Sequence, residues 1–471
     1  MASYSIRDTS THNDDQPALF GEISAENCAP APGNGGADSA PLDKYAKSVG
    51  KFGADSAENV APEQQQQCET EPEKNDAEIS GDSPTNRRAE EQRKRRWAMA
   101  HLLWEFSALK RVRHCKRYLA VVKTTDGVGE VEEVQVRRSE DGEAVGYAGL
   151  QTCGSVWACP ACSARIQAQR RLELGLLMTI AAAEGYSVVF TTYTLKHKQG
   201  QALEELWEGL GYAHRRVKQD KTVNGLRKRH GEIGSVRATE VTYGGNGWHP
   251  HTHSLRFYEN TLTQSDVDEM KRNEYRAWKA AAKKRGLGRP SSRAFKMELL
   301  DLGDSHTAEQ LSKYLVKDID EEHQQSAQGR RIADAGKTVS GITFEMQGGA
   351  TKAARRSTSY TPMELLGEFA DTGNVEFLER FNEYELASHG KRALSWSPGL
   401  KARFNVAEKT DEAIAAESIG TEEDRVFGIT AEGWQRVCYT RTAAIILNTL
   451  TSRGIGAAKE VCEELGIAIN D

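Results

Sequence analysis

The sequence predicts an α+β domain in which helices cover an antiparallel sheet. Residues 187–195 and 235–243 are rich in β-branched and aromatic side chains, which is typical of strands. The second run continues through a Gly-rich turn into another apolar run, and this order favours a hairpin. Apolar residues with helical spacing occur in residues 163–183 and 266–285, before and after these strands. A further strand is expected at residues 295–301.

Composition limits the class of protein. The chain has 471 residues, enough for two or three domains, and its mean hydropathy of -0.63 is polar for a single compact globule. No run approaches the roughly 20 apolar residues of a membrane span, and the first residues lack the pattern of a signal peptide. We therefore expect a cytoplasmic protein, in which the eight cysteines are thiols or metal ligands and not disulfides.

The charge is distributed unevenly along the chain. Residues 1–86 hold 16 acidic and 5 basic side chains, a net charge of -11 against -6 for the whole chain, so the remainder carries +5. We expect residues 1–86 to be a disordered acidic tail, because Gly, Pro, Ser, Asp and Glu dominate without apolar periodicity. A mildly basic remainder suits a nucleic-acid-binding protein.

A basic cluster opens the part of the chain that is expected to fold. Two interpretations are equally open: the solvated start of a helix that continues through Trp97 to Phe106, or an arm that contacts phosphates. The cluster consists of Arg87, Arg88, Arg93, Lys94, Arg95 and Arg96.

Closely spaced cysteines predict a structural zinc site. Cys159-Pro-Ala-Cys162 has the form of a zinc knuckle, and Cys153 supplies a third ligand by its spacing. Cys115 is the candidate for the fourth ligand, with His114 as the alternative. Four thiolates leave no open coordination position, so such a zinc stabilises the fold and takes no part in chemistry. The alternative is a set of buried thiols that pack as small hydrophobes.

Two histidines at the start of the last hairpin strand predict a second metal site. Residues i and i+2 of a strand point to the same face, so His251 and His253 project side by side behind the turn at Gly244–Gly247. Neutral imidazole is the commonest metal ligand. Glu240, on the neighbouring strand, is the candidate third ligand and would leave positions open for phosphate and water. Pro250 is expected at the first position of the strand, and His249 in a supporting role at best.

The stretch Trp248-His-Pro-His-Thr-His253 resembles the second motif of the plasmid rolling-circle replication initiators of the HUH endonuclease superfamily. Phe190-Thr-Thr-Tyr-Thr-Leu195 is similar to their first motif, and similar cysteine stretches recur in some members. The resemblance covers roughly residues 110–400. It implies an antiparallel HUH endonuclease core covered by helices, with a zinc-knuckle insertion, the disordered tail and a helical C-terminal region.

A predicted helix at residues 307–318 carries the candidate nucleophile. Tyr314-Leu-Val-Lys317 resembles the third motif of the family, in which the tyrosine attacks DNA. A phenol with a pKa near 10 needs help at neutral pH, and Lys317, Lys313 and a metal would stabilise the phenolate. Some relatives have a glutamate four residues before the tyrosine, as the base for the closing step; here that residue is Gln310.

The remaining regions complete the expected organisation. Gly348–Ser359 is a Gly-rich basic segment, and Lys352, Arg355 and Arg356 are candidates for contact with the DNA backbone. The predicted units are residues 1–86 (tail), 87–165 (basic helix and zinc region), 166–325 (catalytic core), 326–400 (basic loop and helical DNA-binding extension) and 401–471 (charged linker and small helical tail).

The resemblance implies an enzyme that nicks one strand of origin DNA and keeps a 5′-phosphotyrosyl link, leaving a 3′-hydroxyl as primer. Mg²⁺ or Mn²⁺ would be the catalytic ion and Zn²⁺ the structural one. Plasmid origin DNA, single-stranded or in a hairpin, would be the substrate, with the host helicase and polymerase as partners and no membrane. The alternatives are an HUH relaxase or transposase, and a non-catalytic zinc-containing DNA-binding regulator.

Overall fold

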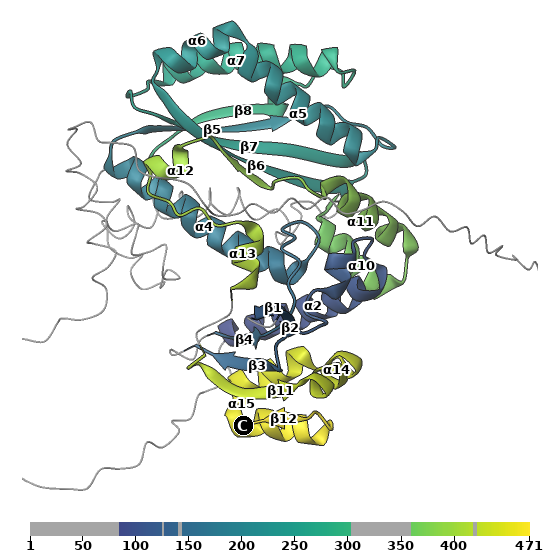
Figure 1. Ribbon diagram of the computed structural model, residues 1–471. Coiled ribbons are helices and arrows are strands. Elements are labelled where there is room, and N and C mark those ends of the chain that lie inside the picture. The colour runs from purple at the N-terminus through teal and green to yellow at the C-terminus, as the bar shows by residue number, and fades with distance from the viewer. Residues whose placement is uncertain (1–83, 125–126, 140–143, 303–358, 418–421) are drawn as a thin grey trace, which may run out of the picture. The chain divides into compact units, whose positions relative to one another are not determined.

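The computed structural model describes residues 84–124, 127–139, 144–302, 359–417 and 422–471 (Figure 1). Residues 1–83 of the predicted disordered tail lie outside these ranges, but residues 84–86 belong to helix α2 (Pro84–Phe106), so the tail was predicted to end three residues too late. Within the described ranges, no helix combines the length and apolar character that a membrane span requires.

A six-stranded antiparallel sheet forms the centre of the fold, and it confirms the α+β prediction. The strand order is β10-β6-β7-β5-β8, with the short β9 also paired to β6. Every pair in the sheet is antiparallel. The strands are β5 (Ser187–Thr194), β6 (Glu232–Gly244), β7 (Gly247–Tyr258), β8 (Phe295–Leu300), β9 (Ser359–Tyr360) and β10 (Leu394–Trp396).

Helices cover both faces of this sheet because its strands alternate apolar side chains between the two faces. On one face lie α5 (Leu203–Gln219), α6 (Lys221–Arg229) and α7 (Gln264–Lys284), packed around Tyr193 and Trp278 (Figure 1). On the other face, α4 (Pro160–Ala183) and α12 (Leu400–Arg403) cover Leu255 and Phe257.

Helix ends follow local side-chain chemistry. Thr263 caps α7 in a reciprocal capping box with Asp266, whereas the sequence pattern favours a start two residues later. Asp220 accepts a hydrogen bond from the Val223 backbone and starts α6, so the basic residues 227–229 belong to a helix. Thr361 caps α10 (Pro362–Thr372) in a capping box with Glu364.

Helix α4 buries only some of the apolar residues that have helical spacing in its sequence. Ile166 and Leu177 are fully buried, but Leu172 and Leu176 are 49 % and 39 % exposed. Leu174 and Met178 take their places in the core. Both choices are compatible with helical spacing, and the sheet on one side of the helix decides between them.

The segments around the sheet are mainly helical. They comprise α2 (Pro84–Phe106), α3 (Lys110–His114), the hairpin β1 (Val121–Thr124) and β2 (Gly127–Glu130), and α11 (Val375–Ser388). The predicted linker after residue 400 contains α12 and α13 (Asp411–Ala416), and Ile414 and Ala415 of α13 are buried.

A second sheet joins the C-terminal residues to an early part of the chain. Its order is β12-β11-β3-β4, with β3 (Glu133–Arg138), β4 (Val145–Ala148), β11 (Arg425–Thr430) and β12 (Ile469–Asn470). The sequence predicts helices after residue 425, and α14 (Ala431–Thr440) and α15 (Ala443–Glu464) are present. The two strands β11 and β12 were not predicted, because they are short and their partners are distant in sequence.

A buried ion cluster connects the sheet to α6 and α7. Glu274 of α7 accepts hydrogen bonds from Arg256 of β7 at 2.7 Å, from Arg227 of α6 at 3.0 Å and from the Tyr193 hydroxyl. Burial raises the pKa of Glu274, but the charges of Arg256 and Arg227 outweigh it and bring the pKa down to about 2. The cluster therefore stabilises the fold fully at neutral pH, and this contribution is lost as the pH falls from about 4.5 toward 2.

Replacement of Glu274 by glutamine is expected to lower the free energy of unfolding at pH 7 by about 3–5 kcal/mol, because it removes the carboxylate partner of the buried Arg256 and leaves Arg227 with only its longer pair to Glu232 at 3.4 Å. Urea denaturation followed by circular dichroism measures this change. Glu269→Gln on the same helix is the matched control, since its pair with Arg229 is solvent-exposed and should contribute at most about 1 kcal/mol. Equal losses in the two variants would contradict the assignment.

Candidate metal centres

The β6–β7 hairpin brings one carboxylate and two imidazoles to the same face of the sheet. Its turn pairs Gly244 with Gly247, and this register sets Glu240 opposite His251 and Ala238 opposite His253. Gly247 has a φ of 79°, a conformation in which a side chain would be strained. The two-residue loop thus determines which side chains of β6 meet the histidines.

The three side chains lie within bonding range of a common ion. Their ligand atoms are all within 4.8 Å of one another. Glu240 Oε2 is 3.0 Å from His251 Nε2 and 3.7 Å from His253 Nε2. Glu240 Oε1 is buried and has no hydrogen-bond partner among the described residues, which suits an oxygen meant for a cation. The group can hold a metal ion.

Strand β5 fixes the orientation of His253. Thr192 Oγ1 is 3.1 Å from His253 Nδ1, and Phe190 stacks on the imidazole with ring centroids 5.3 Å apart. With a metal ion bound, a hydrogen on Nδ1 donated to the threonine would leave the Nε2 lone pair for the ion. Contacts of this kind set the tautomer and the orientation of histidines that bind metals.

Charge at the site favours a cation. Burial raises the pKa of Glu240, but hydrogen bonds from His251 and His253 outweigh it and hold the pKa well below its usual value. Glu240 is thus a carboxylate at neutral pH, and with two imidazoles it gives the N/O donor set of a divalent metal.

Strand β7 begins earlier than predicted. Pro250 is expected at the first position of the strand, but β7 starts at Gly247 and pairs Pro250 with Val241. The ladder with β5 ends at the pair of Thr194 and His251. Beyond it, β6 is the only described neighbour of β7, so a residue without an N–H is tolerated.

His249 therefore shares the face of His251, with ring centroids 5.2 Å apart. Its Nδ1 is 2.6 Å from Nε2 of His197, which follows β5. His197 was not predicted from the sequence, because no motif spacing connects it to β7.

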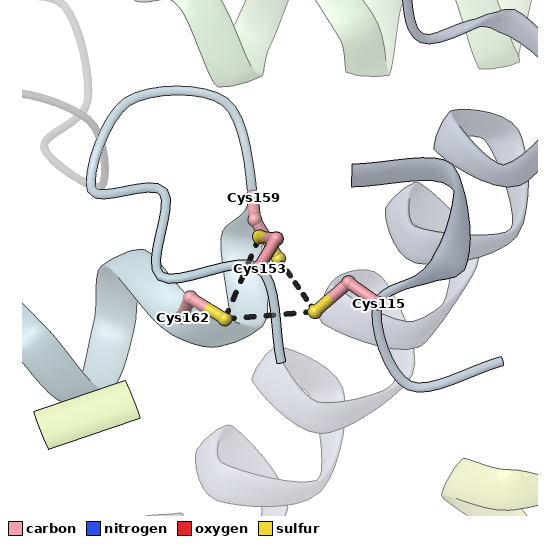
Figure 2. A group of neighbouring side chains, drawn as sticks. All are labelled: Cys115, Cys153, Cys159 and Cys162. Carbon is pink, nitrogen blue, oxygen red and sulfur yellow. Dashed lines mark hydrogen bonds between the residues drawn. The ribbon is translucent and has the colours of Figure 1, made fainter. Parts of the chain in front are cut away.

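The four predicted cysteines form a second cluster. Cys115 follows α3, Cys153 lies in the loop before α4, Cys159 is the N-cap of α4 and Cys162 lies in its first turn. Figure 2 shows the four sulfur atoms directed toward one another. All four residues are buried. The His114 ring instead lies against Tyr118, so Cys115 takes the fourth place.

The sulfur spacing fits a tetrahedral metal. Cys115 Sγ is 3.5 Å from Cys162 Sγ and 3.6 Å from Cys159 Sγ, and Cys153 Sγ is 3.7 Å from Cys162 Sγ. Zn–S bonds of about 2.3 Å in a tetrahedron separate the sulfurs by about 3.8 Å, whereas a disulfide requires about 2.05 Å. Hydrogen bonds from Cys115 and the two other thiols lower the pKa of Cys162, whereas hydrogen bonds within the cluster and burial raise the pKa of Cys153 and of Cys159. The cluster can hold a metal ion.

The remaining predicted site residues lie outside the described ranges. These are the proposed nucleophile with its lysines and the proposed DNA contacts of the basic segment: Tyr314, Lys317, Lys313, Lys352, Arg355 and Arg356. Their roles stay predictions from the sequence.

Comparisons with known proteins identify the family of the chain. A family model described as "Replication protein" matches residues 148–437, more than half of the chain. The chain is 26 % identical over 368 residues to "Protein rep" of Streptomyces lividans, which covers 65 % of this chain and 76 % of that protein. It is 32 % identical over 143 residues to "Neomycin resistance protein" of Streptomyces cyanogenus, 25 % of this chain and 32 % of that protein. No solved structure matches. The resemblance to plasmid replication initiators is thus confirmed, and the chain belongs to the replication protein family.

Proposed function

We propose that the protein initiates plasmid replication by binding the origin and nicking one DNA strand with a tyrosine nucleophile and a divalent metal. The observation that carries this proposal is the group of Glu240, His251 and His253, whose ligand atoms lie within 4.8 Å of one another. Three protein ligands are fewer than the coordination number of Mg²⁺ or Mn²⁺, so open positions remain for phosphate oxygens.

A Mg²⁺ or Mn²⁺ ion at these residues would polarise the scissile phosphate and stabilise the charge that develops on it. The residues themselves supply a rigid frame. His251 and His253 come from one strand, Glu240 from its hairpin partner, and the Thr192 hydroxyl holds His253 in place. Such a frame costs little reorganisation when the DNA reacts.

Tyr314 is the proposed nucleophile. Its phenol oxygen would form a bond to phosphorus while the bond from phosphorus to the 3′ oxygen breaks. The phenol proton is lost, and the 3′ oxygen leaves as a hydroxyl after taking up a proton. Lys317 and Lys313 are proposed to stabilise the phenolate. Lys352, Arg355 and Arg356 are proposed to hold the DNA backbone.

The four-cysteine cluster is proposed to bind a structural Zn²⁺. Four buried thiolates complete a tetrahedral shell and leave no position for substrate. The ion would connect the segment after α3 to the start of α4, which are distant in sequence. Its contribution is to folding, because structural zinc sites fix chain segments that have little apolar core of their own.

Covalent capture of DNA tests the function. Wild-type protein incubated with 3′-end-labelled single-stranded origin DNA and Mn²⁺ is expected to give a labelled protein band on a denaturing gel, because the tyrosine keeps the fragment on the 3′ side of the nick. Tyr314→Phe is expected to reduce that band by at least about 1,000-fold, because the variant has no nucleophilic oxygen. DNA binding by gel shift should be unchanged.

Tyr439→Phe is the matched control, because Tyr439 lies on α14 with 81 % of its surface exposed. Persistence of the covalent band in Tyr314→Phe would show that another residue is the nucleophile. Absence of the band from wild-type protein with intact binding would favour a DNA-binding regulator. Capture on a transfer origin or a transposon end, but not on a replication origin, would favour a relaxase or transposase.

A further inference from the structure

We infer that a cationic pocket beside the cysteine cluster holds the phosphodiester backbone of DNA. The pocket has a volume of about 810 Å³ and lies between α2, the residue after Cys115, α4 and the start of α10. Six basic side chains line it: Arg93, Arg95, Arg96, Lys116, Arg165 and Arg171. The inference rests on the proposed function in one respect, since it takes DNA as the partner.

The cysteine cluster builds part of this pocket. Lys116 directly follows Cys115 and has a φ of 58°, while its backbone N–H donates to Gln151 at 2.8 Å. Arg165 lies one helical turn after Cys162 on α4. The segments that the four sulfurs bring together therefore carry two of the six cations. The predicted zinc region thus positions basic side chains at the pocket.

Three of these cations form no ion pair with a carboxylate that the structure describes. In the described part of the chain, no carboxylate lies within ion-pair distance of Arg95, Arg96 or Arg165. Glu364, the one acidic residue in the lining, accepts a hydrogen bond from the Thr361 backbone at 2.7 Å as part of a helix cap. Arg170, on the same helix as Arg165, differs from these cations because it pairs with two carboxylates, Glu173 at 2.7 Å and Asp411 at 2.8 Å.

The surroundings of the cations favour an anion. Burial lowers the pKa of Arg96, because its guanidinium has lost water without gaining an opposite charge. Arg93 donates to the Asn448 amide oxygen at 2.5 Å, a neutral acceptor. Phosphate oxygens would restore the missing negative charge, and arginine binds them through paired N–H donors.

The number of charges favours a chain of phosphates. Six cations are more than one phosphate group neutralises, whereas successive phosphodiesters of a strand can each occupy one or two of them. Trp97, Met99 and Tyr147 add an apolar wall to the pocket. A basic groove with aromatic side chains is typical of proteins that hold single-stranded nucleic acid.

The salt dependence of DNA binding tests the inference. Binding of a fluorescein-labelled single strand of origin DNA would be measured by anisotropy over a series of NaCl concentrations. Tyr314→Phe protein is used, without added Mg²⁺ or Mn²⁺, so that no covalent chemistry intervenes. Adding Arg95→Gln and Arg96→Gln together should weaken binding by roughly 10-fold at about 0.1 M NaCl. The slope of log K against log salt should fall by about 0.7 for each lost contact.

Two further variants make the result specific. The control variant, Lys271→Gln with Arg272→Gln, removes two positive charges from adjacent residues of α7 that do not line the pocket. Its slope of log K against log salt should equal that of the Tyr314→Phe protein within error. Arg95→Lys with Arg96→Lys should restore most of the slope, since lysine is also a phosphate-binding cation. Zinc content and thermal melting of each variant show that the fold is intact.

The outcomes separate this inference from the proposed function. Equal slopes for the pocket and the α7 variants would overturn the inference, whatever the nicking assay shows. Inorganic pyrophosphate that binds the pocket while the DNA slope stays unchanged would overturn it too, in favour of a small-anion site. A reduced slope in the pocket variant, together with no covalent band from wild-type protein, would uphold the inference and reject the nicking function.

Discussion

Cys159→Ser is expected to release the metal of the cysteine cluster and to lower the melting temperature by more than about 10 °C. Structural zinc contributes about 10–16 kcal/mol to folding in small zinc domains, which is comparable to the entire stability of many proteins. Loss of one thiolate from a closed tetrahedral shell removes most of this contribution. The three remaining sulfurs lie within 3.5–3.7 Å of their neighbours, and would then be buried without a cation. Metal analysis and differential scanning calorimetry measure the two effects.

Cys438→Ser is the matched control. Cys438 is half-buried on α14, its Sγ lies 3.8 Å from the Arg117 carbonyl oxygen, and it belongs to no metal group. This variant should keep a full metal content and melt within a few degrees of wild type. One zinc ion per chain in wild-type protein is expected. A metal-free wild-type protein that melts like Cys159→Ser would show that the four thiols only pack against one another.

His251→Ala is expected to reduce nicking by at least about 100-fold without loss of DNA binding, because it removes one of three proposed metal ligands. Glu240→Gln should have a similar effect, since an amide oxygen keeps the shape but not the charge. Thr192→Val should cause a smaller loss, about 10–100-fold in metal affinity, because it only frees His253 to rotate. Nicking rates over a Mn²⁺ titration separate weaker metal binding from slower chemistry.

An exposed histidine provides the reference for this series. His389 follows α11 and belongs to neither metal group, so His389→Ala should retain full activity. The order of the losses is also informative. If Thr192→Val is impaired as severely as His251→Ala at saturating Mn²⁺, the threonine acts on the DNA itself and not through His253. Full activity in Glu240→Gln would remove this residue from the proposed ligand set.

The hairpin could be predicted in detail because its geometry is local. A two-residue loop at Gly245 and Asn246 fixes the register, and the alternation of side chains along a strand then sets Glu240 opposite His251. The cysteines were predictable for a different reason, since three of them lie within ten residues of one another. Only the choice between Cys115 and His114 required the structure, because α3 ends at His114 and the chain turns to an extended conformation at Cys115, which the sequence does not indicate.

What the sequence did not reveal depends on contacts between distant segments. His197 meets His249 across 52 residues. The choice of the buried stripe on α4 depends on the sheet, since Leu174 and Leu176 are equally apolar but only Leu174 is buried. The cationic pocket draws its arginines from two helices that are about 70 residues apart, and a charge run gives no indication of which partner lies opposite.

The pairing of β3 with β11 has a consequence for synthesis of the protein. Arg425 binds Glu133 across 292 residues, so this edge of β3 has no β11 partner until almost the whole chain has left the ribosome. At about 5–20 residues per second, the wait is roughly 15–60 s. An uncovered strand edge is prone to pair with other chains during that time. Slower initiation or a lower growth temperature should therefore increase the yield of correctly folded protein, and a version shortened before residue 425 would leave the edge uncovered permanently.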